Sequence, residues 1–220
     1  MTKQVIIGFA AEGPTDVRFL RSIIQRTFED VAFECEGAVE VLPVQYLNHE
    51  PGDFVEATFV YAEKAIERGI MVLCIHTDAD AAHDDNAFHH KIKPAFDYIR
   101  RSDTELCKNL VAVVPVRMTE AWMLADPDVL KNEIGTSEDN DVLCIDKPPE
   151  SYADPKQVIT QAIHLAYADL PAKRRRKLGI AELYLSLGQK LGFEALERLG
   201  SYRKFKAAVR KAYRQLNYLH

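Results

Sequence analysis

Three carboxylate residues follow predicted strands, at places where they could share one ion. Glu12 follows the apolar run Val5–Phe9, and Asp78 and Asp80 follow the apolar run Ile70–His76 as a D-x-D pair. Alternate residues of an extended chain point to the same side, so carboxylates with this spacing can reach toward one cation. Hard cations such as Mg²⁺ prefer oxygen ligands and bind through a few carboxylates together with substrate phosphates. The pattern predicts a site for Mg²⁺ or Mn²⁺.

Each of these residues also has an ordinary structural explanation. Glu12 precedes Gly13-Pro14 and could be a polar turn residue, and the two aspartates lie in a polar stretch that solvent could surround. Glu120 follows the next apolar run and could be a further metal ligand or a group that orients one. It could equally be an acidic residue in the first turn of a helix, where it would complement the helix dipole.

Further charged residues near these positions could contact a metal or a phosphate. Arg18 and Arg117 are candidate cations beside a phosphate, and Asp16 is an additional carboxylate in the first turn of a predicted helix. His76 and His83 could touch a metal ion, because imidazole suits zinc and manganese. The histidine spacing matches no regular ligand frame, so surface or helix-capping histidines remain the alternative.

The positive charge of the chain is concentrated near its C-terminal end. Residues 171–220 contain thirteen Lys and Arg against three Glu, and with the whole chain at −5 this leaves −15 for residues 1–170. Cations on such a surface could neutralise nucleic-acid phosphates. Two alternatives are a solvated helix face and docking of the tail on the acidic body. The candidate phosphate contacts are Arg174, Arg175, Arg176, Arg203, Lys206, Arg210 and Arg214.

The elements that must position these residues alternate between strand and helix. The predicted strands cover residues 5–9, 39–46, 70–76 and 110–116, with helical patterns after the first and over 54–68 and 87–101. Continuous apolar strands suit a parallel sheet that is covered on both faces. We therefore predict an α/β, Rossmann-like fold over residues 1–135, with a mostly parallel four-stranded sheet flanked by helices. In such sheets, ligands bind beyond the carboxyl ends of the strands.

The pattern changes after residue 135. A polar stretch is followed by an all-helical segment over residues 150–220, which begins with the cap signal Asp154-Pro155 and ends with an amphipathic helix over 202–218. We predict a basic, helical C-terminal extension. The single tryptophan, Trp122, is predicted to lie in the core rather than to stack on a base.

Several functional classes are excluded by what the sequence lacks. The four cysteines form no C-x-x-C pair, so their spacing indicates neither a zinc knuckle nor a disulfide framework. The phosphate-binding loop, dinucleotide-binding and nucleophile-elbow motifs are all missing, which excludes nucleotide triphosphatases, dinucleotide-binding enzymes and α/β-hydrolases of the familiar kinds. The N-terminal apolar stretch is too short for a signal peptide or a membrane span. These observations predict a cytoplasmic protein that does not contact a membrane.

Four motifs in this order resemble a known pattern. They are EGPTD at 12–16, DAD at 78–80, TEAWMLAD at 119–126 and DPK at 154–156. Together they resemble the Toprim fold of topoisomerases, bacterial primases and OLD-type nucleases. More narrowly, they resemble a prokaryotic Toprim-like family called domain of unknown function 4276, and this resemblance covers nearly the whole chain.

The resemblance implies a metal site in which Glu12 is a metal-linked general acid or base and Asp78 and Asp80 are ligands. It also implies an association with phage defence, sometimes beside an ATPase of the OLD or SMC type encoded nearby. The chain has no topoisomerase tyrosine domain and no primase zinc module, which argues against those two reactions.

The leading functional hypothesis is a phosphodiesterase that needs Mg²⁺ or Mn²⁺ and acts on DNA or RNA. One alternative is a metal-binding effector module that is inactive or that depends on a partner ATPase. Another is a small-molecule phosphotransferase with Asp78 as its nucleophile. A homodimer is also kept open.

Overall fold

The computed structural model describes residues 2–168 and 178–220. Its strands are β1 (Lys3–Val5), β2 (Ile7–Ala10), β3 (Val39–Val41), β4 (Gln45–Tyr46), β5 (Val72–His76) and β6 (Leu110–Val113). The first helices are α1 (Pro14–Ala32), α2 (Phe54–Glu67), α3 (Asp85–Ala87), a π-helical turn (Phe88–Ile92) and α4 (Lys93–Arg101).

The later part of the described chain is helical, as predicted. It comprises α5 (Glu120–Met123), α6 (Pro127–Ile134), a 3-10 turn (Pro149–Ser151), α7 (Pro155–Ala166), a second 3-10 turn (Ile180–Glu182), α8 (Leu183–Lys190), α9 (Phe193–Leu196) and α10 (Gly200–Gln215). The Asp154 side chain accepts a hydrogen bond from Gln157 N, which confirms the predicted cap of α7. In the ranges that the structure describes, no helix combines the length and apolar character needed to cross a bilayer.

The central sheet has four parallel strands in the order β4-β2-β5-β6, and a two-stranded parallel sheet, β1-β3, lies beside it. This confirms the predicted α/β class with mostly parallel strands, and the arrangement is compatible with a Rossmann-like fold. Two of the predicted strands are each divided into two. The 39–46 strand is interrupted around Pro43, which has no N–H to donate to a ladder, and the 5–9 strand is interrupted at Ile6.

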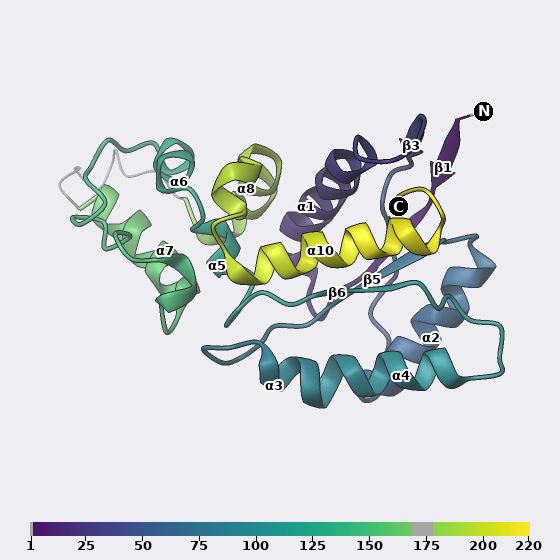
Figure 1. Cartoon of the computed structure of the whole chain (residues 1–220). Coiled ribbons are helices and arrows are strands. Elements are labelled where there is room, and N and C mark those ends of the chain that lie inside the picture. Colours follow the sequence, from purple (N-terminus) through teal and green to yellow (C-terminus); the bar gives the residue numbers. More distant parts are fainter. Residues whose placement is uncertain (1, 169–177) are drawn as a thin grey trace.

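Helices cover both faces of the central sheet. Helices α1 and α10 lie on one face, whereas α2 and α4 lie on the other (Figure 1). Successive strand residues point to opposite faces. Accordingly Phe9 and Cys74 pack in the cluster that contains α1 and α10, and their neighbours Ala10 and Ile75 pack in the cluster that contains α2 and α4.

The last helix is part of the core that covers the sheet. The Trp122 side chain is fully buried, makes a T-shaped contact with Tyr202 at 5.4 Å and donates a hydrogen bond to Ser201 Oγ at 2.7 Å. Asn109, just before β6, donates to the Ala212 carbonyl at 3.1 Å. The core position predicted for Trp122 is confirmed, and the segment 150–220 contacts the α/β segment through α8 and α10.

Helices α1 and α8 approach each other closely at a glycine. A Cβ atom added to Gly188 would lie 2.6 Å from the carbonyl oxygen of Phe19 in α1. Arg26 of α1 also donates to the carbonyls of Gly188 and Leu191, at 3.0 and 2.7 Å. The absence of a side chain at position 188 therefore sets the distance between the two helices.

We expect Gly188→Ala to lower the free energy of unfolding by about 1–3 kcal/mol, because the clashing atom belongs to the α1 backbone and the helices must separate. Alanine alone would stabilise a helix interior by about 1 kcal/mol over glycine, so a net loss isolates the clash. Urea unfolding measures it, with the exposed neighbour Gln189→Ala as control. A Gly188→Ala protein as stable as the wild type would contradict this packing.

Candidate functional site

The direction of the chain crossovers reverses between the two central strands. The chain leaves β2, passes through α1 to β4 on one side, and returns through α2 to β5 on the other side of β2. Open parallel sheets bind ligands beyond the carboxyl ends of the strands at such a point. Glu12 lies two residues after β2, and Asp78 lies two residues after β5. The fold thus brings the predicted carboxylates to one edge.

Two of the predicted carboxylates meet around a single lysine. Lys91 Nζ lies 3.4 Å from Glu12 Oε1 and 3.6 Å from Asp80 Oδ2. Thr77 donates to Glu12 Oε1 at 2.6 Å, and Lys91 donates to Thr77 Oγ1 at 2.9 Å. The side chains of Glu12 and Asp80 are 45% and 73% exposed, so solvent and a substrate can reach this group. We call Glu12, Thr77, Asp80 and Lys91 the carboxylate–lysine group.

Asp78 has a different set of partners. Its Oδ1 accepts from Thr119 N at 3.0 Å and lies 3.2 Å from His76 Nε2. Thr119 Oγ1 also lies 3.2 Å from the same imidazole nitrogen. His76 is buried, and its Nδ1 has no partner among the described residues. Asp78 therefore ties the end of β5 to the start of α5, and His76 supports that link.

The loop after β5 is held by an unusual backbone pairing. Asp80 and Arg117 are non-glycine residues with φ of 54° and 63°, in the left-handed region, where a residue costs about 1–3 kcal/mol. Asp80 N donates to Arg117 O at 2.9 Å, and Arg117 N donates to Ala81 O at 3.1 Å. These two bonds fix Asp80 at the edge of the sheet, where its carboxylate reaches Lys91.

Glu120 is buried beside the site rather than in the carboxylate–lysine group. It is 5% exposed, accepts a hydrogen bond from Tyr184 OH and lies 3.9 Å from Lys156 Nζ. Burial raises the pKa of Glu120, and the Tyr184 hydrogen bond offsets only part of this effect. The nearby Asp78 charge also raises the pKa of Glu120, so the two carboxylates repel each other. The predicted roles of Glu120, as a metal ligand or as a group that orients one, stay predictions.

The donor atoms suit a hard divalent cation, but the predicted three-carboxylate cluster is not assembled. In residues 2–168 and 178–220, no group of three or more His, Cys, Asp or Glu is placed to hold a metal. Glu12 and Asp80 converge on the Lys91 ammonium, whereas Asp78 is engaged by Thr119 and His76. Two carboxylates with water and phosphate oxygens can still satisfy Mg²⁺. Metal binding stays a prediction, with Glu12 and Asp80 as the converging pair.

Other predicted residues lie around this edge or apart from it. Asp16 lies in the first turn of α1, and Arg18 is exposed on the same helix. His83 is exposed and lines a different cavity, together with Asp84 and Lys204. The Arg117 Nε is buried and has no hydrogen-bond partner among the described residues.

The predicted basic face of the last helix is largely used inside the chain. Lys206 is only 7% exposed, and it contacts Asp30 at 2.7 Å and also Glu197. The alternative of a solvated helix face is therefore wrong at Lys206, because its contacts with two carboxylates outweigh the cost of its burial. Burial lowers the pKa of Lys206, yet the hydrogen bonds to these carboxylates leave it raised.

The other predicted basic residues of the helix, Arg203, Arg210 and Arg214, also have partners within the chain. Arg210 donates two hydrogen bonds to Glu34, at 2.7 and 2.8 Å, and this guanidinium lowers the pKa of Glu34. Arg203 donates to carbonyls at the end of α9, and Arg214 donates to the His220 carbonyl at 3.1 Å. The run Arg174, Arg175 and Arg176 lies outside the described residues. Nucleic-acid binding by these residues stays a prediction.

Sequence reasoning missed Lys91 and Thr77. Lys91 lies in the π-helical turn Phe88–Ile92, which changes the helical phase relative to the regular helix predicted over residues 87–101. No short motif in the sequence marks this lysine as a partner of Glu12. Thr77 immediately precedes Asp78, so its proximity to the site could have been inferred, but its contact with Glu12 depends on the pairing of β2 with β5.

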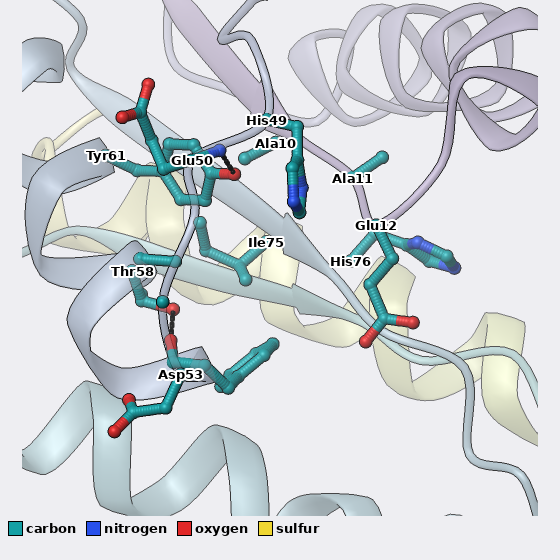
Figure 2. A pocket seen from close by; sticks show the side chains of 13 residues that line it. Ala10, Ala11, Glu12, His49, Glu50, Asp53, Thr58, Tyr61, Ile75 and His76 are labelled. Carbon is teal, nitrogen blue, oxygen red and sulfur yellow. Dashed lines mark hydrogen bonds between the residues drawn. The ribbon is translucent and has the colours of Figure 1, made fainter.

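A cavity of about 270 Å³ opens beside Glu12 at the same edge of the sheet. Its walls come from the ends of β2 and β5, the loop after β4 and the first turns of α2 (Figure 2). Glu12 and His76 line this cavity and also belong to the polar contacts described above. The cavity and the carboxylate–lysine group therefore share Glu12.

Comparisons of the chain with models of protein families, with curated proteins and with solved structures found no match. We therefore infer function from the geometry of this edge of the sheet.

The raised pKa of Glu120 predicts how stability changes with pH. Between the ordinary pKa of 4.5 and the raised value, the folded protein binds more protons than the unfolded chain, so the free energy of unfolding falls as pH increases through this window. Glu120→Gln cannot ionise, but it keeps an acceptor for Tyr184. We expect the free energy of unfolding of Glu120→Gln, relative to that of the wild type, to be higher at about pH 7 than at about pH 4. Urea unfolding at the two pH values measures this difference.

The exposed substitution Glu67→Gln is the matched control and should show no such shift. A difference between Glu120→Gln and the wild type that is the same at both pH values would contradict the burial of this carboxyl group.

Proposed function

We propose that this protein is a phosphoester hydrolase that depends on Mg²⁺ or Mn²⁺ and acts on nucleic acid. The observation that carries this proposal is the convergence of Glu12 and Asp80, from the ends of neighbouring central strands, on one positive charge. Two exposed carboxylates at the switch point of a parallel sheet form the kind of oxygen-rich edge that binds a hydrated divalent ion and a phosphate.

The residues of the edge have separable tasks in this proposal. Glu12 and Asp80 would hold the divalent ion, which supplies positive charge to a phosphoryl group as it is attacked. Thr77 orients Glu12 by donating to Oε1, which leaves the second carboxylate oxygen to accept a proton from water. Asp78 holds the end of β5 to the start of α5 through its hydrogen bond with Thr119. Its negative charge adds to the attraction of this edge for cations.

Lys91 has two roles that follow from its contacts. Its ammonium neutralises Glu12 and Asp80 while no other cation lies between them. Its long side chain is 35% exposed, so it can move away from the carboxylates and pair with a phosphate. This arrangement makes Lys91 a competitor of the divalent ion and a cation for the substrate.

We expect Glu12→Gln and Asp80→Asn each to remove Mn²⁺ binding and to lower Mn²⁺-dependent cleavage by about 10²–10⁴-fold, because each change deletes a negative charge without changing the shape of the side chain. Mn²⁺ binding is measured by calorimetry, and cleavage is measured on single-stranded, linear and supercoiled substrates. Asp85→Asn, an exposed change in the same acidic loop, is the control. Cleavage that survives both site changes would refute the proposal.

We expect Lys91→Met to bind Mn²⁺ about fivefold more tightly, or more, because an interaction of about 1 kcal/mol with a competing charge is lost. Lys93→Met is the matched control, since it removes a lysine of the adjoining helix that pairs with Asp97 instead. Titration of both variants and the wild type with Mn²⁺ at the same ionic strength measures the difference in Mn²⁺ affinity. Equal or weaker Mn²⁺ binding by Lys91→Met would show that Lys91 does not compete with the ion.

A further inference from the structure

The cavity beside Glu12 has mostly apolar walls. Ala10, Ala11 and Ile75 line it from the ends of the strands, and Phe54 and Ala57 line it from α2. A group that enters can therefore exchange contact with water for contact with hydrocarbon over much of its surface. The volume of about 270 Å³ is slightly below the usual range for ligand pockets, so one ring system fits better than a larger ligand.

Most polar groups around the cavity already have partners. Asp53 Oδ1 accepts from the first turn of α2, Thr58 Oγ1 donates to the Phe54 carbonyl, and Tyr61 OH accepts from Glu50 N. These contacts fix the wall of the cavity before any ligand arrives. The Thr58 and Tyr61 contacts are the two dashed lines in Figure 2.

His49 and Glu12 are polar side chains of the lining that remain available to a ligand. His49 is exposed and has no hydrogen-bond partner among the described residues, and Glu12 engages Thr77 and Lys91 through Oε1. In Figure 2 the His49 ring lies between Tyr61 and Glu12. The lining therefore offers hydrogen-bonding groups beside an apolar surface.

The lining offers an anion no cation inside the cavity. Glu12 lines it, the carboxylate of Glu50 is already paired with Lys64, and among the described residues no lysine or arginine lines the cavity. A phosphate or carboxylate would meet negative charge there and would lose its hydration without gaining a cation. A neutral ring with polar edges meets neither cost, because its faces contact hydrocarbon and its edge can bond to Glu12 and His49.

Glu12 connects this cavity to the site of the proposed reaction. Its side chain lines the cavity, and its Oε1 belongs to the carboxylate–lysine group. A ligand that fills the cavity with a neutral ring would therefore place its attached groups beside Lys91 and Asp80. Lys91 is a cation at that point, and a phosphate is the attached group that it would attract.

We propose, resting on the function proposed above, that the cavity binds one unpaired nucleobase of the substrate and thereby places the adjoining phosphate at the carboxylate–lysine group. The substrate class is consequently single-stranded nucleic acid. A base in a duplex must first leave its stack and its pairing partner before it enters such a cavity, and this costs binding energy. A base in a single strand is already free to pack against an apolar wall.

Ala57→Leu tests the cavity directly, because it fills space between α2 and the strand ends. Ala181→Leu, the same change at an exposed position outside the cavity, is the matched control. The first readout is the binding of adenosine and cytidine in the absence of metal. Changes in the NMR chemical shifts of the protein measure this binding. We expect Ala57→Leu to weaken binding of these nucleosides about tenfold or more, and Ala181→Leu to leave it unchanged.

The second readout is Mn²⁺-dependent cleavage. We expect the wild type to cleave a single strand better than a duplex of the same sequence. Ala57→Leu should raise KM for the single strand, but it should leave cleavage of an oligonucleotide with an abasic site at the scissile position unchanged. If Ala57→Leu does not fold, His49→Ala replaces it, with nucleoside binding expected to weaken about fivefold through loss of one hydrogen bond.

The outcomes separate this inference from the proposed function. If neither nucleoside binds the wild type, or if the folded cavity variant binds both as well as the wild type does, the cavity proposal is overturned, whatever the cleavage assay shows. If nucleoside binding depends on the cavity but no cleavage depends on Glu12 and Asp80, the proposed reaction fails while the base-binding site stands.

Discussion

Parallel pairing of β2 with β5 is the constraint on which the rest of the structure depends. The pairing runs from Ile7 opposite Val72 to Ala10 opposite Ile75, so both strands end at the same level. Residues shortly after each strand must then lie close together, although they are far apart in the sequence. The reversal of the chain crossovers at these strands leaves a crevice at this edge of the sheet. The cavity and the polar contacts described above lie at this edge.

Gathering negative charge at one edge has an electrostatic cost, which the structure reduces in two ways. Lys91 lies between Glu12 and Asp80, and the hydroxyl of Thr77 donates to Glu12. Asp78 is stabilised differently, by the backbone N–H that begins α5. Hydrogen bonds and an opposite charge both offset the repulsion between neighbouring carboxylates. The carboxylates can therefore gather at an edge that remains partly open to water.

Acidic residues of the N-terminal part of the chain and basic residues of the C-terminal part contact each other in the folded protein. In α10, Lys206 and Arg210 pair with Asp30 and Glu34 at the end of α1 and just after it. These contacts agree with the alternative in which the basic tail docks on the acidic body. They fasten α10 against α1 and so complete one face of the sheet, which in turn fixes the strand ends that carry the site.

Patterns in the sequence alone determined the class of fold and the edge at which chemistry could occur. The strand and helix periodicities, the cap at Asp154 and the carboxylates after two apolar runs are local properties, and local backbone preferences are sufficient to predict them. Short strands were predicted less well where a proline interrupts pairing, as at Pro43. Whether pairing is interrupted at such a residue depends on which neighbouring strand each segment pairs with.

Only the tertiary structure decided which side chains meet. Lys91 reaches Glu12 because a π-helical turn sets the direction of its side chain, and Lys206 is buried because α10 lies on α1. Asp78 accepts from Thr119 N instead of joining Glu12 and Asp80, because β6 lies next to β5 and places the start of α5 there. These contacts join residues dozens of positions apart, and their partners depend on strand order and helix phase, which no local pattern specifies.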